Sequence, residues 1–455
     1  MLFKLPEITL DASRGIPLYQ QIADALRRAV IDGMLRPGDR LPPTRELARR
    51  LGVNTVTTAR AYRELARRGW VSSTVGRGTF VCRQSRGKGC TSFAGEVGDL
   101  FPMEVLRGII NEVIDEDGAG AFAYDDAGGY EPLRASLSKL LVSSGFDLLD
   151  HELVVFSGAQ QGLSILVKVL VRPGDWVLVE RPTYPGILRL LAHTGARIEA
   201  VDLSGSGPDS RVLERLFRTR PFRLAYVMPT FQNPTGICYS DSQKRRLAVL
   251  CRTHGVALVE DDAFSDLDYG GGRRSPLRGV AEAFGECIYL KSFSHVMLPG
   301  FRLGFCLCSP RLAELLRRAK AEADLFSSGF FQRVLTHFIN RGHFSEHLFR
   351  LQVSEQDRLR AVLSSRGVLA ECGVTSLEPA GGVTLWCTLP AGIDPDRFHA
   401  SCIQMQLPVV RGTEFSATAG LVRQFALSFR GLSGTRLHQT VRQVADLVSG
   451  QRRVS

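Results

Sequence analysis

Residues 292–305 read SFSHVMLPGFRLGF. The stretch combines two serines, a Pro-Gly corner and Arg302, which is typical of a turn that holds a phosphate group, because hydroxyl and guanidinium groups donate hydrogen bonds to phosphate oxygens. His295 lies at its centre. The residue at this position determines which chemistry the turn supports, and the neighbouring sequence indicates the fold that surrounds it.

The neighbouring sequence alternates short apolar runs with segments of helical pattern. This alternation predicts an α/β domain with a mostly parallel sheet, in which ligand-binding groups lie at the ends of the strands. Four polar clusters occupy such positions, and the quoted stretch is one of them. The apolar runs are residues 152–156, 176–179, 198–201, 224–228, 256–259 and 287–290, and the other polar clusters are residues 157–161, 229–236 and 260–262.

Length and composition limit the class of protein. A chain of 455 residues has room for two or three domains, and 44% hydrophobic residues without a run of about 18 apolar positions predict a globular protein with no membrane helix. The first residues lack the pattern of an export signal. The ten cysteines form no CxxC pair, which favours reduced, buried thiols over a disulfide frame or zinc site and predicts a cytoplasmic location.

The positive charge is concentrated in residues 1–90. This segment has 17 Lys and Arg against 7 Asp and Glu, so it carries +10 of the chain's formal net charge of +11. A small basic module attached to a nearly neutral body indicates a polyanionic partner for the module, although a solvated arginine-rich surface has the same composition.

The sequence pattern within residues 1–90 distinguishes a module with a polyanionic partner from a solvated surface. Residues 17–34 repeat apolar side chains at helical spacing, and shorter helices are expected over residues 44–51 and 55–68. Two short helices joined by a glycine-containing turn predict a helix-turn-helix, whose second helix enters the major groove of DNA. The alternating residues 70–81, with glycines at the turn, predict a hairpin wing.

Residues 41–81, LPPTRELARRLGVNTVTTARAYRELARRGWVSSTVGRGTFV, resemble the winged helix-turn-helix of GntR-type bacterial transcription regulators. The resemblance implies DNA contacts from the start of the second helix, the start of the third and the wing, and short polar side chains at these places reach base edges and phosphates. The alternative is a basic helical adaptor without a DNA target. The implied DNA-binding residues are Arg45, Asn54, Thr55, Thr57, Thr58, Arg77 and Gly78.

The four polar clusters together resemble those of the fold-type I aminotransferases, enzymes that use pyridoxal 5′-phosphate (PLP). A GntR-type head joined to such a body is the architecture of the MocR-type regulators, and this resemblance covers essentially the whole chain. It implies a winged-helix head at residues 1–82, a linker at 83–98, an aminotransferase-like large domain at 99–345 and a small C-terminal domain at 346–455.

The same resemblance implies a role for each residue of a cofactor site. Asn233 would hydrogen-bond the ring hydroxyl of PLP, Asp261 would pair with the pyridinium nitrogen, and Tyr184 would stack on the ring. Tyr124 matches a tyrosine that reaches the phosphate from a partner subunit, so a homodimer is implied. A helix start and a fixed guanidinium suit a phosphate dianion. The implied phosphate-binding residues are Gly158, Ala159, Gln160, Ser292, Ser294 and Arg302.

Three positions depart from the family pattern. His295 stands where the family has the lysine that forms a Schiff base with PLP, and imidazole forms no stable imine. Lys291 lies nearby, but from a strand it is expected to point elsewhere. Ala263 replaces a tyrosine that contacts the ring hydroxyl. Ala426 replaces the arginine that clamps a substrate carboxylate, and Arg423 is close enough to substitute for it.

Three functions remain open for the body. It binds PLP or another small effector non-covalently and signals to the head, or it is an enzyme in which His295 acts as a base on a pyridoxamine phosphate adduct, as in certain sugar dehydratases of this fold. The third possibility is that the site is empty and the body serves only for dimerisation. The first agrees best with a DNA-binding head, and it predicts a homodimeric transcriptional regulator without catalytic residues or a metal.

Overall fold

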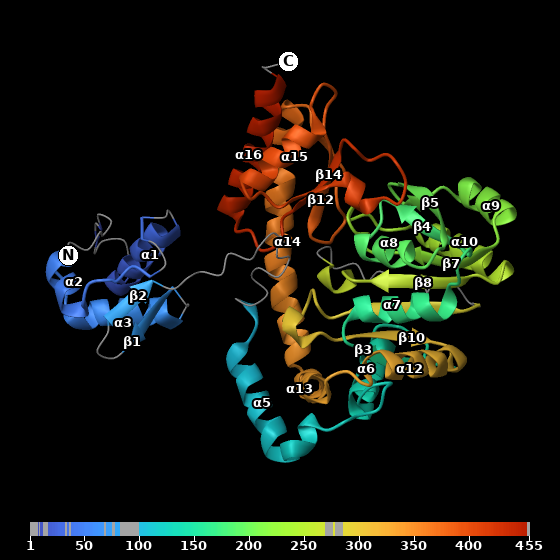
Figure 1. The fold of residues 1–455 in the computed structure, drawn as a ribbon, viewed down its shortest axis with the longest axis horizontal. Coiled ribbons are helices and arrows are strands. Elements are labelled where there is room, and N and C mark those ends of the chain that lie inside the picture. Colours follow the sequence, from blue (N-terminus) through green and yellow to red (C-terminus); the bar gives the residue numbers. More distant parts are fainter. Residues whose placement is uncertain are drawn as a thin grey trace. The chain divides into compact units, whose positions relative to one another are not determined.

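The computed structural model describes residues 8, 10, 11, 17–31, 34, 35, 38–67, 70–74, 78–81, 100–268, 276, 277 and 285–452. The chain divides into two compact units, Met1–Thr91 and Ser92–Ser455 (Figure 1). No helix among the described residues is both long and apolar enough to cross a membrane. The predicted linker, residues 83–98, lies outside the described residues, and the predicted domain boundaries stay predictions.

The described residues of the first unit form three helices and a hairpin. Apolar residues at helical spacing, such as Ile22, Leu26 and Leu65, are buried in its core. Tyr62 Oη donates a hydrogen bond to Pro42 O at 2.7 Å, which ties the third helix to the segment before the second. The predicted winged-helix pattern is therefore confirmed. Its elements are α1 (Leu18–Ile31), α2 (Thr44–Leu51), α3 (Thr55–Arg67), β1 (Val71–Thr74) and β2 (Gly78–Val81), and the two strands pair antiparallel.

The second unit is built on an eight-stranded sheet, which confirms the predicted α/β class. In this sheet, β4 pairs parallel with β5 and β7, and β8 pairs parallel with β7 and β9. Strand β10 pairs antiparallel with β3 and β9. The spatial order is β3-β10-β9-β8-β7-β4-β5-β6. The bounds are β3 (Glu152–Phe156), β4 (Trp176–Arg181), β5 (Arg197–Ser204), β6 (Gly207–Pro208), β7 (Phe222–Val227), β8 (Ala257–Asp262), β9 (Cys287–Ser292) and β10 (Gly304–Cys308).

Helices cover both faces of this sheet (Figure 1). They are α6 (Glu131–Ser143), α7 (Ala159–Leu170), α8 (Pro185–Ala192), α9 (Ser210–Thr219), α10 (Asp241–Thr253), α12 (Pro310–Asp324) and α13 (Gly329–Asn340), whereas α5 (Met103–Asp117) packs against α13. Because successive side chains of a strand point to opposite faces, Val154 and Phe156 of β3 pack in the core formed with α7, α8 and α12. Leu153 and Val155 pack in the other core, with α6 and α13.

The C-terminal part has a small antiparallel sheet of order β11-β12-β14-β13. A long helix, α14, packs against the last helix, α16, through apolar residues that include Val362 and Val441. The predicted boundary at residues 345 and 346 falls within α14, a continuous helix. The elements are α14 (His343–Glu371), β11 (Thr375–Ser376), β12 (Thr384–Thr388), α15 (Pro395–Gln404), β13 (Val409–Arg411), β14 (Gln424–Ser428) and α16 (Gly434–Arg452). Short 3-10 helices are η2 (Gly118–Phe122), η3 (Ser265–Leu267), η4 (Pro299–Phe301) and η5 (Gly412–Phe415).

Candidate cofactor site and nucleic-acid interface

A cavity of about 180 Å³ lies at the carboxyl ends of β8 and β9, beside the start of α7. Neighbouring parallel strands bring their carboxyl ends to one edge of the sheet, so residues far apart in the sequence meet there. The lining contains every predicted cofactor-site residue except Gly158 and Tyr124. The lining residues are Ala159, Gln160, Leu163, Tyr184, Met228, Asn233, Asp261, Ala263, Ser292, Ser294, His295 and Arg302.

One end of this cavity concentrates positive potential and hydrogen-bond donors. Gly158 precedes the first residue of α7 and has φ 93°, a backbone conformation that favours glycine. A Cβ on Gly158 would lie 2.9 Å from Nη2 of Arg302, so a side chain here would require the guanidinium to shift away from the helix start. Arg302 Nη2 donates to Ser157 O at 3.3 Å. A helix N-terminus beside a guanidinium is a site for an anion.

The two serines of the quoted stretch line the same cavity. Ser292 is buried and ends β9, and its Oγ accepts a hydrogen bond from Ser294 N at 3.2 Å. Both serines line the cavity that Arg302 borders. The turn thus combines the groups that its sequence predicted for binding phosphate oxygens.

A buried carboxylate lies at the cavity as well. Asp261 near the end of β8 is 5% exposed, and its Oδ2 accepts a hydrogen bond from Tyr226 Oη at 2.6 Å. Burial raises the pKa of Asp261 to about 6, although the hydrogen bond from Tyr226 acts in the opposite direction. A cation bound next to this carboxylate would relieve the cost of burying its charge.

The aromatic wall of the cavity is held in place by a hydrogen bond. Tyr184 Oη donates to Gln160 Oε1 at 3.0 Å. Burial raises the pKa of Tyr184, and the negative charge of Asp261 raises it further, so the phenol stays protonated and acts as the donor. Asn233 and Ala263 line the cavity too, and Ala263 leaves no hydroxyl where the family has a tyrosine.

His295 is bound by a residue that the sequence analysis missed. Arg430 follows β14, and its Nη1 lies 2.5 Å from His295 Nδ1 while its Nη2 donates to His295 O at 2.6 Å. Burial and the positive charges of Arg430 and Lys291 keep the pKa of His295 well below its usual value, so the ring is neutral. The ring also packs against Phe264, with centroids 4.5 Å apart.

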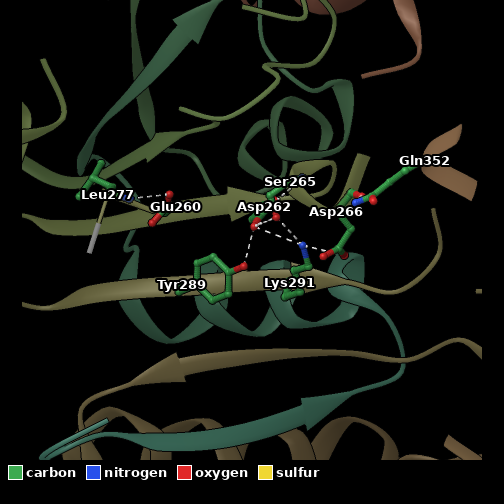
Figure 2. A network of polar contacts seen from close by, with 8 residues as sticks. All are labelled: Glu260, Asp262, Ser265, Asp266, Leu277, Tyr289, Lys291 and Gln352. Atoms are coloured by element: carbon green, nitrogen blue, oxygen red, sulfur yellow. Dashed lines mark hydrogen bonds and ion pairs between the residues drawn. The ribbon is translucent and has the colours of Figure 1, made fainter. Parts of the chain in front are cut away.

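Lys291 points to the opposite face of the sheet, as its position next to Ser292 in a strand predicts. Its Nζ lies 3.2 Å from Asp262 Oδ2 and 2.9 Å from Asp266 Oδ2, and it donates to Ser265 Oγ at 2.7 Å (Figure 2). Burial lowers the pKa of Lys291, but the two carboxylates outweigh it and raise the pKa above its usual value. A charged, paired ammonium is no nucleophile, and Lys291 does not line the cavity of His295.

The hypothesis that Arg423 substitutes for the lost carboxylate clamp is not supported. Arg423 Nε and Nη2 donate to Leu389 O at 3.0 and 2.6 Å, so this guanidinium is engaged at the start of β14 and does not line the cavity. Ala426 is buried in a small core with Trp386 and Phe415.

Tyr124 lies outside the cavity formed by its own chain. Its side chain is 81% exposed, and the edge of its ring meets Phe326 with centroids 5.1 Å apart. Tyr124 therefore does not contribute to the cavity of its own chain.

The start of α3 presents polar side chains at the surface of the first unit. Asn54 is exposed, and its Oδ1 accepts a hydrogen bond from Val56 N at 2.8 Å, so it caps the helix. Thr55 is exposed and Thr57 is half-buried. Arg45 is exposed on α2. The side chains that open α3 and the guanidinium of Arg45 are therefore accessible to a ligand.

Thr58 corrects the predicted DNA-binding set. Its side chain is fully buried, and its Oγ1 donates to Thr44 O at 3.0 Å and to Thr55 O at 2.9 Å. The hydroxyl therefore joins α2 to α3 inside the domain and is not accessible to DNA.

The wing and one further surface residue lie beside these candidate positions. Gly78 has φ 112°, and a Cβ there would lie 2.7 Å from Arg40 Nε, so the wing strand needs glycine to pass Arg40. Arg77 lies outside the described residues. Val56, 66% exposed at the start of α3, was missed. Its position out of phase with the buried Ala61 and Leu65 would have indicated an exposed apolar side chain.

Two family profiles match the chain. "Aminotransferase class I and II" matches residues 98–426, and "Bacterial regulatory proteins, gntR family" matches residues 18–81. The chain is 26% identical to the uncharacterized HTH-type transcriptional regulator YdcR of Escherichia coli, over 94% of this chain and 98% of YdcR. It is 27% identical to the probable rhizopine catabolism regulatory protein MocR of Rhizobium meliloti, over 76% of each.

Aminotransferases are similar to most of this chain as well. The 2-aminoadipate transaminase of Thermus thermophilus is 30% identical over 80% of this chain and 91% of its own length. The crystal structure of the Pyrococcus horikoshii kynurenine aminotransferase, in complex with PMP, superposes with a TM-score of 0.73 at 27% identity, covering 78% of this chain and 88% of that one. The chain thus belongs to the class I and II aminotransferase family and, because a GntR domain precedes that domain, to the MocR-type regulators.

Proposed function

We propose that this protein is a transcriptional regulator that binds operator DNA through its head. The observation that carries the proposal is the start of α3, where Asn54 and Thr55 are exposed and Thr57 is half-buried, on a segment whose net charge is +10. Such a segment binds phosphates electrostatically, and short polar side chains at the start of a recognition helix reach base edges. The regulators YdcR and MocR support this function, which implies a cytoplasmic location.

The head also has an apolar group for reading bases. Val56 lies between the polar residues that open α3. Its side chain is 66% exposed, so packing in the core does not explain an apolar residue at this position. An apolar side chain in the major groove contacts the 5-methyl group of thymine. We therefore include Val56 with Arg45, Asn54, Thr55, Thr57, Arg77 and Gly78 in the proposed interface, and leave Thr58 out of it.

The body is proposed to bind PLP, or a compound with the same phosphate and ring, without a covalent bond. The residues of the cavity fit this group: Arg302 and the start of α7 suit the phosphate, and the buried Asp261 suits a protonated ring nitrogen. When bound, PLP supplies an electrophilic aldehyde and an electron-withdrawing ring. This chain's own residues bind and orient it, and no lysine among the lining residues attaches it.

The contact with Arg430 argues against His295 as a catalytic base. A guanidinium only donates hydrogen bonds, so Nδ1 of His295 must accept and the proton of the neutral ring lies on Nε2. A ring nitrogen that carries a proton cannot take one from a substrate. His295 held in this way donates from Nε2 and orients a ligand, which supports a non-catalytic body over the enzyme alternative.

The same cavity argues against the body as an empty scaffold. Asp261 is buried with a raised pKa, and Gly158 keeps the approach of Arg302 open, although neither feature benefits a site that holds nothing. A bound effector would neutralise the charges of Asp261 and Arg302 at once. Signalling from this site to the head is part of the proposal.

The body is also proposed to form a homodimer. Tyr124 is 81% exposed, and Phe122, at 63% exposure, stacks on Phe330 with centroids 4.9 Å apart. Large aromatic side chains exposed together are typical of a protein–protein interface. A partner subunit would cover them and place Tyr124 near the phosphate end of the other site.

The role of Asp261 predicts a pH dependence of cofactor binding. At about pH 7 we expect PLP to bind the parent more tightly than Asp261→Asn, because the carboxylate attracts the protonated ring nitrogen. Since burial raises the pKa of Asp261 to about 6, protons compete for it at lower pH. The ratio of the two affinities should fall about tenfold between about pH 7 and about pH 5.

Absorbance titrations of both proteins with PLP at the two pH values measure this ratio. Ionisation of the PLP phosphate affects parent and variant alike, so the ratio reports on Asp261. An unchanged ratio would show that Asp261 does not pair with the ring nitrogen.

A further inference from the structure

A second and larger cavity lies on the opposite face of the sheet from the cofactor site. Its volume is about 380 Å³, within the range of roughly 300–1,000 Å³ that is typical of small-molecule sites. Asp262 and Lys291 line it, whereas their neighbours Asp261 and Ser292 line the cofactor site, because side chains alternate along β8 and β9. The two cavities therefore share two strands but no lining residue.

Most of the lining is apolar and comes from two helices and the sheet. The lining residues from α6 and the segment after it are Leu137, Leu140, Leu141, Ser143, Ser144 and Phe146, those from α14 are Phe344, Ser345 and Leu348, and those from the sheet and its loops include Tyr289, Phe293 and Phe305. An apolar enclosure of this kind accommodates an aliphatic or aromatic group.

The ammonium of Lys291 and the phenol of Tyr289 at its polar end are already in use. Lys291 Nζ has three N–H bonds, and it has three acceptors in Asp262, Asp266 and Ser265 (Figure 2). Tyr289 Oη donates to Asp262 Oδ2 at 2.5 Å. Neither the ammonium nor the phenol therefore has a proton to offer to a carboxylate or phosphate on a ligand.

An acceptor remains at the same end. Asp266 is 23% exposed and uses Oδ2 for Lys291, and within the part of the chain that the structure describes no group donates to its Oδ1. Among the described lining residues, the two carboxylates of Asp262 and Asp266 share the single ammonium of Lys291. The excess of negative charge and the available oxygen select a ligand that donates hydrogen bonds and carries positive charge.

We propose that this cavity binds a small primary amine with an apolar body, in which the ammonium group meets Asp266 and the body lies among the side chains of α6 and α14. The site is separate from the proposed PLP site. A ligand there contacts the residues adjacent to Asp261 and Ser292 on β8 and β9, and so reaches the strands that carry the cofactor residues.

Calorimetric titration of the full-length, PLP-free protein with phenethylamine tests the proposal. We expect the parent to bind phenethylamine and not phenylacetate, which has a similar body and the opposite charge. Asp266→Asn should weaken the amine about tenfold or more, because it removes a charged hydrogen bond. Glu346→Gln is the matched control, since Glu346 lies beside Ser345 on α14 but does not line the cavity.

A second variant keeps the test independent of the ion pair with Lys291. Ser345 is exposed at the edge of the cavity, so Ser345→Trp should place an indole in it and abolish amine binding without disturbing the core. Absence of phenethylamine binding in the parent would overturn the proposal. Equal binding of phenylacetate, or full affinity in both Asp266→Asn and Ser345→Trp, would overturn it as well.

Discussion

The variant His295→Lys should turn yellow with PLP and retain the cofactor after borohydride reduction, whereas the parent should release it. The cavity supplies groups for the phosphate and ring, and the parent lacks only an amine. Burial and the charges of Arg430 and Lys291, which lower the pKa of His295, would lower the pKa of a lysine ammonium at the same position. A fraction of neutral, nucleophilic amine follows from this.

Mass spectrometry of the reduced protein measures the attachment as one cofactor mass on residue 295. Ala263 removes a tyrosine that contacts the ring in the family, so incomplete attachment agrees with the prediction. His295→Gln, which removes the imidazole without adding an amine, is the control and should retain nothing. An adduct on Lys291 in the parent would contradict the pairing of this lysine with Asp262 and Asp266.

Binding of operator DNA should weaken steeply with salt and depend on Arg45. If a dimer makes six or more phosphate contacts, affinity should fall about a thousandfold between roughly 50 and 200 mM salt. Arg45→Ala should weaken binding to all sequences and flatten the salt dependence, because it removes a phosphate contact from each head. Thr57→Ala should instead reduce the preference for operator over unrelated DNA.

The matched control for Arg45 is Arg50 on the same helix, whose Nη2 lies 2.6 Å from Glu46. Arg50→Ala removes the same formal charge but a guanidinium that is already paired, so its effect should be much smaller. Fluorescence anisotropy at several salt concentrations measures all three variants. Equal losses for Arg45→Ala and Arg50→Ala would mean that net charge alone binds DNA.

The fold was predictable because its signals are local. Each apolar run predicted as a strand corresponds to a strand of the sheet, and alternation along β8 and β9 correctly predicted that Lys291 points away from the cavity. The quoted stretch, read as a turn, also contains the start of β10, which pairs antiparallel between β3 and β9. That pairing joins segments distant in the sequence, and no local pattern encodes it.

The site was less predictable where contacts are long-range. Arg430 contacts His295 although the two residues are 135 positions apart in the sequence, and no local pattern at either residue predicts the contact. Thr58 is different, because helical spacing places it on the face of α3 that holds the buried Ala61, Tyr62 and Leu65. Its burial was therefore available from the sequence, and the polar side chain concealed it.

DNase I footprinting of the full-length protein on the DNA upstream of its own gene tests the central proposal most directly. A homodimeric regulator should protect two half-sites whose centres lie about 10–10.5 bp apart, or a multiple of that spacing. Protection should persist in excess unrelated DNA at low salt. Absence of protection, or uniform coverage without preferred sites at saturating protein, would contradict the account of this chain as an operator-binding regulator.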